Sequence, residues 1–215
     1  MAGRTPPARI GGMDTPPPAP VCETVLIERA TRFPNLVVAL DGAVLLSHGG
    51  SPAVPPPPGQ RLAVRRSADG GISWDAPATL QEPAIQGGGM LVDERSGAVL
   101  CFAQPHHPHP RRPRPAFPAV VHRSDDHGRT WRPLAATFLP DALGNVPALH
   151  MAEHGIALRH GPRAGRLLRA ARVYDGDNHL GEEHRGYNTA IFSDDGGLTW
   201  QASAPFPDRG TGEGA

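Results

Sequence analysis

The sequence lacks the features that mark several protein classes. It contains no run of about 18 apolar residues, which excludes a transmembrane helix. Its formal net charge is +0 at pH 7, which gives no support for binding to nucleic acid or to a membrane surface. The two cysteines, Cys22 and Cys101, are too few for a disulfide framework; they could pair, although separate thiols are favoured. Residues 1–20 hold no apolar core of a secretory signal, which leaves the compartment open and slightly favours the cytoplasm.

Glycine and proline, in contrast, are abundant. Each contributes 26 of the 215 residues, and this composition favours many short strands over helices. Residues 1–20 are rich in both without periodicity, which predicts a disordered tail before one folded region, 21–215. Short apolar or alternating runs bounded by turn residues predict strands at 23–28, 35–40, 43–47, 90–92, 98–102, 155–159 and 166–173.

All three tryptophans close the same eight-residue phrase. The copies read SADGGISW at 67–74, SDDHGRTW at 124–131 and SDDGGLTW at 193–200. A phrase that recurs at intervals of about 60 residues indicates repeated supersecondary units. Each copy follows a β-like run, and these runs lie at 62–66, 119–123 and 189–192. We therefore interpret each phrase as the turn between two strands.

The residue types within the phrase suit a turn. An aspartate in the third position can fold its carboxylate onto nearby backbone N–H groups, and a glycine two residues later can adopt positive φ. The tryptophan buries a large ring that anchors the hairpin. We therefore interpret the aspartates as structural rather than catalytic; they are Asp69, Asp126 and Asp195.

The phrase resembles the Asp-box, or BNR, repeat, and the chain resembles the sialidase family. That family folds as a six-bladed β-propeller with Asp-boxes at the hairpin turns of several blades. The resemblance implies an all-β fold, and the spacing of the boxes allows about three to three and a half sialidase-type blades. Because a propeller is stabilised by closing its ring, we expect this chain to be the N-terminal half of a longer protein or a truncated reading frame.

Two segments resemble substrate-binding positions of the family. Thr31-Arg32-Phe33-Pro34 resembles its RIP motif, whose arginine is one of three that hold the substrate carboxylate. The planar guanidinium of Arg32 matches a carboxylate with two hydrogen bonds. Tyr187 and Asn188 open a segment that runs into the third box and resembles the family's YxNAIYSDDGGxTW stretch, so both are candidates for lining the pocket.

A further match suggests a general base. The stretch GTGEG at 210–214 resembles a family segment whose glutamate assists the nucleophile. Sialic acid carries a carboxylate on its anomeric carbon and would repel an anionic nucleophile, so the family uses a tyrosine whose proton a glutamate withdraws. The resemblance assigns this role to Glu213, and the tyrosine and the other two arginines would lie beyond Ala215. It implies neither a metal nor an organic cofactor.

The chain departs from the family where the acid/base aspartate is expected. The family carries this residue in the loop after the first hairpin, but residues 47–60 contain no Asp or Glu. His48 is only a geometric candidate for the role, and Asp41 is interpreted as a turn residue.

Two groups of histidines could suggest metal ligands. His106, His107 and His109 lie among prolines and arginines, which disfavours a cation site and indicates a solvated loop. His150 and His154 match no trusted metal-binding spacing, and we expect them to face the central cleft of the propeller.

These features together predict an exo-α-sialidase-like glycoside hydrolase that releases terminal sialic acid from glycoconjugates. Its partner would be a sialylated glycan or another acidic sugar. The chain alone is expected to be inactive, because at most Arg32 and Glu213 of the family's catalytic positions are present. The alternative is a non-catalytic Asp-box propeller that binds glycans or proteins. An open blade face would expose apolar residues and favour self-association.

Overall fold

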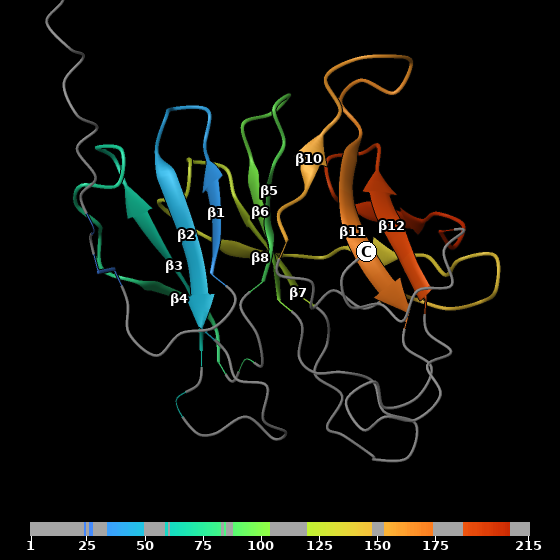
Figure 1. Cartoon of the computed structure of the whole chain (residues 1–215), viewed down its shortest axis with the longest axis horizontal. Coiled ribbons are helices and arrows are strands. Elements are labelled where there is room, and N and C mark those ends of the chain that lie inside the picture. The colour runs from blue at the N-terminus through green and yellow to red at the C-terminus, as the bar shows by residue number, and fades with distance from the viewer. Residues whose placement is uncertain are drawn as a thin grey trace, which may run out of the picture.

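The described part of the chain is built entirely from strands and connecting segments. The computed structural model describes residues 24, 26–27, 34–49, 59, 61–82, 84, 88–103, 120–147, 153–173 and 187–206 (Figure 1). These residues contain thirteen strands in three sheets and no helix, which confirms the all-β prediction. Accordingly, this part of the chain has no helix that could cross a membrane.

Each sheet contains an antiparallel meander of four consecutive strands, and we call the sheets blades 1, 2 and 3. Blade 1 contains β1 (Asn35–Val38), β2 (Val44–Gly49), β3 (Leu62–Ser67) and β4 (Ala78–Gln81). Blade 2 contains β5 (Met90–Val92), β6 (Val99–Ala103), β7 (Val120–Ser124) and β8 (Arg132–Leu134). Blade 3 contains β10 (Ile156–Ala157), β11 (Leu167–Val173), β12 (Tyr187–Ser193) and β13 (Thr199–Ala202).

Blade 3 has a fifth strand that comes from the connection after blade 2. Strand β9 (Thr137–Phe138) pairs parallel with β13 at the outer edge of blade 3. Phe138 stacks on Trp200 with ring centroids 6.4 Å apart. This cover helps to explain why Trp200 is fully buried, whereas Trp74 and Trp131 are only half-buried.

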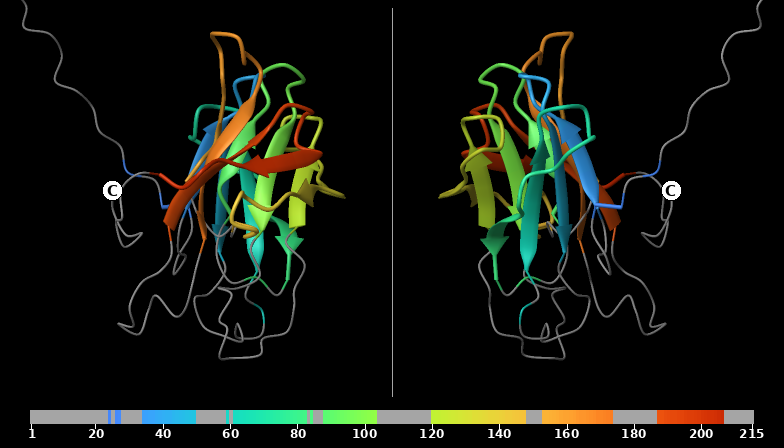
Figure 2. Two further views of the ribbon diagram at one scale, coloured as in Figure 1. Left: turned by 90° about the vertical axis from the view of Figure 1, so that its right-hand side faces the viewer. Right: turned by 90° about the vertical axis from the view of Figure 1, so that its left-hand side faces the viewer.

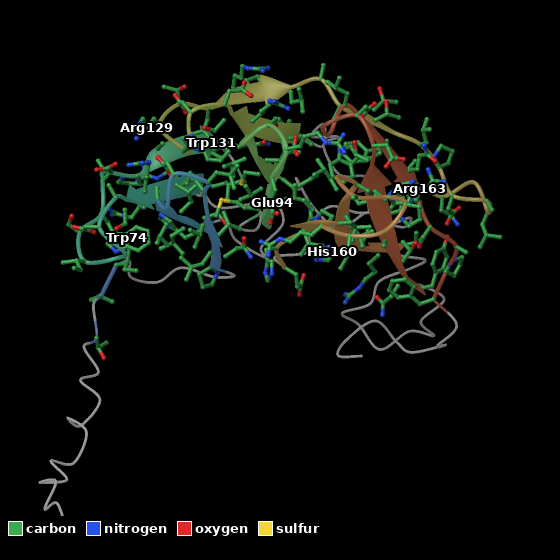
Figure 3. All side chains as sticks on the ribbon, turned by 90° about the horizontal axis from the view of Figure 1, so that it is seen from above. Trp74, Glu94, Arg129, Trp131, His160 and Arg163 are labelled. Carbon is green, nitrogen blue, oxygen red and sulfur yellow. The ribbon has the colours of Figure 1, made fainter. Side chains whose placement is uncertain are left out.

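The blades follow one another in a curved row. Their first strands, β1, β5 and β10, contact one another in that order, so they form the inner side of the row (Figure 3). One core cluster, which includes Leu45, Leu62 and Val99, fills the space between blades 1 and 2. A second cluster, which includes Leu100, Phe102 and Ile191, fills the space between blades 2 and 3. This radial packing agrees with the predicted partial propeller.

Most of the predicted strands are present with small shifts at their ends. The prediction at 35–40 becomes β1, and the predicted Asp41-Gly42 turn forms with Gly42 at φ 83°. The prediction at 155–159 was too long, since β10 covers only Ile156–Ala157. The prediction at 23–28 is wrong for its described residues, because Thr24, Leu26 and Ile27 have no strand partner and Leu26 is exposed.

Each of the three tryptophan phrases forms the turn between the third and fourth strands of a blade. In the first, the N–H of Gly71 donates to Ser67 Oγ (2.8 Å), and the N–H of Ser73 donates to Asp69 Oδ1 (2.9 Å). The indole N–H of Trp74 closes the turn on the carbonyl of Gly71 (2.9 Å). The same three bonds recur in the second phrase and in the third. The aspartates therefore hold the turns, as interpreted.

The hydrogen bonds also set the acidity of the box aspartates. The hydroxyl and N–H of Ser73 lower the pKa of Asp69 to about 2. Burial alone would raise the pKa of Asp126, but bonds from Thr130 and Ser124 outweigh it and lower that pKa to about 2. Both carboxylates are therefore ionised in the folded protein at neutral pH.

Neighbouring blades meet through the boxes. A Cβ on Gly128 of blade 2 would lie 2.5 Å from Leu45 Cδ2 of blade 1, and a Cβ on Gly197 of blade 3 would lie 2.6 Å from Leu100 Cδ1 of blade 2. Only glycine allows this approach at the positive φ that both positions adopt. The second and third boxes thus each pack on a leucine of the preceding blade.

Candidate functional site

The strand directions divide each blade into two ends. We call the end with the three boxes the box end, and its hairpins are seen together in Figures 1 and 2. We call the other end of the blades, away from the boxes, the opposite end. There, Gly49 pairs with Leu62, and Val173 pairs with Tyr187. The connections from the second to the third strand of every blade therefore leave from this opposite end. Loops at one end of a rigid sheet scaffold are a common place for binding residues.

Two predicted site residues, Arg32 and Glu213, lie outside the described residues. The described residues nearest to them are informative nonetheless. Asn35 begins β1 opposite Ser47, and the N–H of Phe206 donates to the carbonyl of Asn188 (2.9 Å). Both anchor points lie at the opposite end, so the chain leads toward Arg32 and toward Glu213 from the same end of the blades.

A buried polar network fixes the start of β1 and of β5 at this end. The N–H of Met90 donates to Asn35 Oδ1 (2.9 Å), and Ser47 Oγ donates to the carbonyl of Gly88 (2.7 Å). A side chain on Gly88 would overlap the backbone of Phe102. The sequence needs glycine here because the segment before β5 lies directly against the backbone of β6 in the same blade.

Arg169 is a buried cation between blades 2 and 3 that sequence reasoning missed. It is 3% exposed, and its guanidinium lies 4.2 Å from the ring centroid of Phe102. Burial lowers its pKa to about 10, so it stays charged at neutral pH. A signal was available in the strand LLRAARV, where Arg169 occupies the same alternating phase as Leu167 and Ala171. A charged residue in the buried phase of a strand is rare unless it has a partner, so this pattern indicates a buried arginine with a specific contact.

Arg169 lies beside the segment that enters the third inner strand. A Cβ on Gly89 would meet both the carbonyl of Glu153 and, at 3.1 Å, Arg169 Nη2. The N–H of Gly155 donates to the carbonyl of Met90 (2.9 Å). The two inner strands β5 and β10 are therefore joined at the opposite end, next to a positive charge that is shielded from water.

Tyr187 lies at the opposite end, but its hydroxyl is engaged by a turn. The hydroxyl donates to the carboxylate of the buried Asp141, and Asn145 Nδ2 donates to the Tyr187 oxygen (3.0 Å). Burial would raise the pKa of Asp141, but the bonds from Tyr187 and from backbone N–H groups lower it. Asn188 is half-buried and pairs with Arg172. The structure places both residues at the end opposite the boxes.

A cleft runs along the inner strands. It has a volume of about 560 Å³, and its lining includes Leu36, Val38, His154 and Ile156. His154 is thus placed as expected, whereas His150 and the cluster His106, His107 and His109 lie outside the described residues. His48 is buried in β2. Within the described residues, no group of three or more His, Cys, Asp or Glu side chains is placed to hold a metal ion.

Comparison with known proteins explains the repeated geometry. The family model for the BNR/Asp-box repeat matches residues 191–202, which include the third box. A sialidase of Micromonospora viridifaciens is 30% identical over 229 residues, which cover 94% of this chain. The chain is a relative of the sialidases. It spans 34% of the length of that protein.

Solved structures support the fold of this sialidase relative. The Hadza microbial sialidase Hz136 superposes with a TM-score of 0.56 at 21% identity, over 82% of this chain and 37% of that chain. A protein of unknown function from Dyadobacter fermentans superposes with a TM-score of 0.56 at 23% identity, over 81% of this chain and 54% of that chain. Both cover most of the blades described above.

Proposed function

We propose that this chain forms one side of the substrate site of an exo-α-sialidase-like glycoside hydrolase. The substrate would be a glycoconjugate with terminal sialic acid. The observation that carries the proposal is the 30% identity to a sialidase along 94% of the chain. The Asp-box turns add support, since they build the same blade scaffold in each repeat.

In this proposal, Arg32 binds the carboxylate of sialic acid. A guanidinium can donate two parallel hydrogen bonds to a carboxylate, and it stays charged at every relevant pH. Arg32 lies three residues before Asn35, which is held by the N–H of Met90 at the opposite end of the blades. A rigid anchor this close along the chain limits how far the arginine can move from the site.

Glu213 acts as the general base in the same proposal. It withdraws the proton of a tyrosine, and the tyrosine oxygen attacks the anomeric carbon while the bond from that carbon to the aglycone oxygen breaks and the aglycone leaves. Water then cleaves the tyrosine–sugar bond and releases sialic acid. Support comes from the position of Phe206, whose N–H is held by Asn188 at the opposite end of blade 3. Tyr187 and Asn188 are proposed to line the pocket from β12, with Tyr187 oriented by its bond to Asp141.

The test is hydrolysis of 4-methylumbelliferyl sialoside by the intact protein. Glu213→Gln should lower kcat by about 100-fold or more, as expected for loss of a general base. Arg32→Lys should mainly raise KM, because lysine cannot form the paired bonds. Asp125→Asn is the control, since Asp125 pairs with Arg132 at the second box, does not line the cleft, and should leave turnover unchanged. Unchanged kcat in Glu213→Gln would remove Glu213 from the mechanism.

A non-catalytic glycan-binding protein is the second candidate. Residues 47–60 contain no carboxylate, and His48 is buried, so no acid/base group is evident after the first hairpin. This candidate predicts that the intact protein binds sialosides without releasing 4-methylumbelliferone at any pH from about 4 to 8. Release of the fluorophore would reject it.

A further inference from the structure

The two interfaces between neighbouring blades share a polar contact at the box end. In blades 1 and 2, the residue before the box serine is an arginine that donates to the box of the next blade. Arg66 Nε donates to the carbonyl of His127 (3.0 Å). Arg123 Nη1 donates to the carbonyl of Gly196 (3.1 Å). His127 and Gly196 hold the same position in their boxes, so the two interfaces can be compared position by position.

Between blades 1 and 2, two arginines neutralise a carboxylate in the turn that joins the first two strands of blade 1. Asp41 Oδ2 lies 2.9 Å from Arg66 Nη2 and 3.3 Å from Arg129 Nη2. Arg129 belongs to the second box and reaches back across the interface to blade 1 (Figure 3). The first box has Ala68 after its serine, so it has no carboxylate there to compete for Arg66. The charge of Asp41 is therefore balanced from both sides of the interface.

Between blades 2 and 3, the turn that joins the first two strands of blade 2 also carries an aspartate, Asp93, which is 6% exposed. Its carboxylate accepts hydrogen bonds from the N–H of Arg95 (3.0 Å) and from the hydroxyl of Ser96 (2.6 Å). A buried carboxylate is costly unless a positive charge compensates it. Among the residues that the structure describes, no guanidinium pairs with Asp93 as two do with Asp41.

Differences at two box positions explain why both arginines are missing. Asp125 follows the serine of the second box, where the first box has an alanine, and it binds Arg123 Nε (2.6 Å). Leu198 of the third box stands where the second box has Arg129. Arg123 is thus held within its own blade, and Leu198 brings no charge to Asp93.

A notch of about 580 Å³ lies at the box end between blades 2 and 3, where the arginine is missing. Asp93, Gly196 and Leu198 line this notch, and a Cβ on Gly196 would still lie 3.9 Å from Asp93 Oδ2. Leu134 adds a second apolar side chain to its wall. Blades 2 and 3 supply all of these residues, and the core cluster around Phe102 fixes the two blades to each other. Both walls of the notch are therefore rigid.

The other charged groups of the notch already have partners. Their contacts are Arg132 with Asp125 (2.9 Å), Asp194 with Arg166 (2.7 Å), Arg95 Nη2 with the carbonyl of Ala164 (2.9 Å), and Asp195 with Ser193 and Thr199 of its own box. The lining holds three arginines and three aspartates, so the notch as a whole is close to neutral. Attraction for a cation is therefore confined to the side of Asp93.

We propose that the notch binds the arginine side chain of a partner protein, with its guanidinium beside Asp93. The guanidinium donates charge-assisted hydrogen bonds to this carboxylate, in the way that Arg129 pairs with Asp41 between blades 1 and 2. The methylene stem of the arginine lies on Leu134 and Leu198, which line the notch. Because the notch is at the box end, away from the proposed substrate site, this binding is a function separate from hydrolysis.

Saturation-transfer NMR of the intact protein with a short peptide tests the proposal. The probe is the tripeptide glycine-arginine-glycine with blocked ends, and its counterpart carries citrulline, which replaces the guanidinium by a neutral urea group of similar shape. A single side chain in a notch that is neutral overall should bind with a Kd of about 1 mM. The citrulline peptide should bind about tenfold more weakly or worse, because it brings no charge to Asp93. Binding of the arginine peptide should weaken as NaCl rises from about 20 to about 300 mM.

Two arginine substitutions provide a variant and its matched control. Leu198→Arg fills the notch from the third box, as Arg129 fills the equivalent place from the second, and it should weaken binding of the arginine peptide by about tenfold or more. Leu198 is 49% exposed, so the change leaves the core intact. Ile72→Arg adds the same charge at the same position of the first box. Because Ile72 is 79% exposed and lies outside the notch, this control should leave binding unchanged.

A third variant removes the charge that the proposal depends on. Asp93→Asn should weaken binding of the arginine peptide by about tenfold, with an unchanged circular dichroism spectrum. Equal binding of the arginine and citrulline peptides, no binding at about 10 mM peptide, or undiminished binding by Leu198→Arg would each overturn the proposal. All of these measurements report binding at the box end, so they stand whether or not the protein hydrolyses sialosides.

Discussion

Replacing Gly197 by alanine should destabilise the protein far more than the same change at the adjacent Gly196. Both glycines lie in the third box and both have positive φ, 93° at Gly197 and 73° at Gly196. Their surroundings differ. A Cβ on Gly197 would lie 2.6 Å from Leu100 Cδ1, whereas a Cβ on Gly196 would find its nearest neighbours at 3.9 Å. The pair therefore separates the cost of backbone conformation from the cost of packing between blades.

The magnitudes follow from these two contributions. Alanine at positive φ costs about 1–2 kcal/mol, and this cost applies at both positions. Overpacking a closed interior costs about 1–3 kcal/mol more, and it applies only at Gly197, because Leu100 is fully buried and has no space to move into. We expect a loss of about 1–2 kcal/mol for Gly196→Ala and about 2–5 kcal/mol for Gly197→Ala.

Urea unfolding followed by tryptophan fluorescence measures both losses. Trp200 is a suitable probe because it is fully buried and its indole N–H bonds to the carbonyl of Gly197 (2.9 Å). The denaturant slope should stay constant between the variants, so that the midpoints report stability. Equal losses for the two substitutions would refute the idea that box glycines are needed for contact between blades.

Two further predictions concern charge and hydrogen bonding. The pKa of Asp126 is about 2 in the folded protein, below its ordinary value of 3.8, so its stabilising effect is complete above pH 3.8 and is lost as the pH falls toward 2. The thermal midpoint of the protein should therefore fall over this pH range, and it should fall less in Asp126→Asn. Parallel curves of midpoint against pH for the two proteins would contradict this prediction. Tyr187→Phe removes the hydroxyl that donates a hydrogen bond to the buried Asp141, so the free energy of unfolding should fall by about 1–3 kcal/mol. Urea titration measures this loss, and an unchanged midpoint would show that the bond contributes nothing to stability.

Local patterns accounted for the repeated turns and most of the strands. The serine, aspartate, glycine and tryptophan of each box bond to one another within eight residues, so their spacing alone predicts the turn. The strand before each box was predictable for the same reason, because side-chain alternation is a property of neighbouring residues. The resemblance to sialidases also rested on such local segments, and the comparison confirms the relationship.

The candidate site was predictable only in part. The sequence indicated Tyr187 and Asn188 as candidates for lining the pocket, and their roles remain predictions; the structure places both at the end of the blades opposite the boxes. It did not indicate that Tyr187 would bond to Asp141, which lies 46 residues away along the chain. Arg32 and Glu213 remain predictions, supported by the positions of Asn35 and Phe206.

By itself, the sequence determined the turns, the alternation of the strands and the family relationship, because each depends on residues that are close along the chain. Only the tertiary structure decided how those units meet. It placed β9 beside β13, buried Arg169 against Phe102, and set Gly197 on Leu100. These contacts join residues far apart in sequence, and their energies depend on distance and burial, which no local pattern encodes.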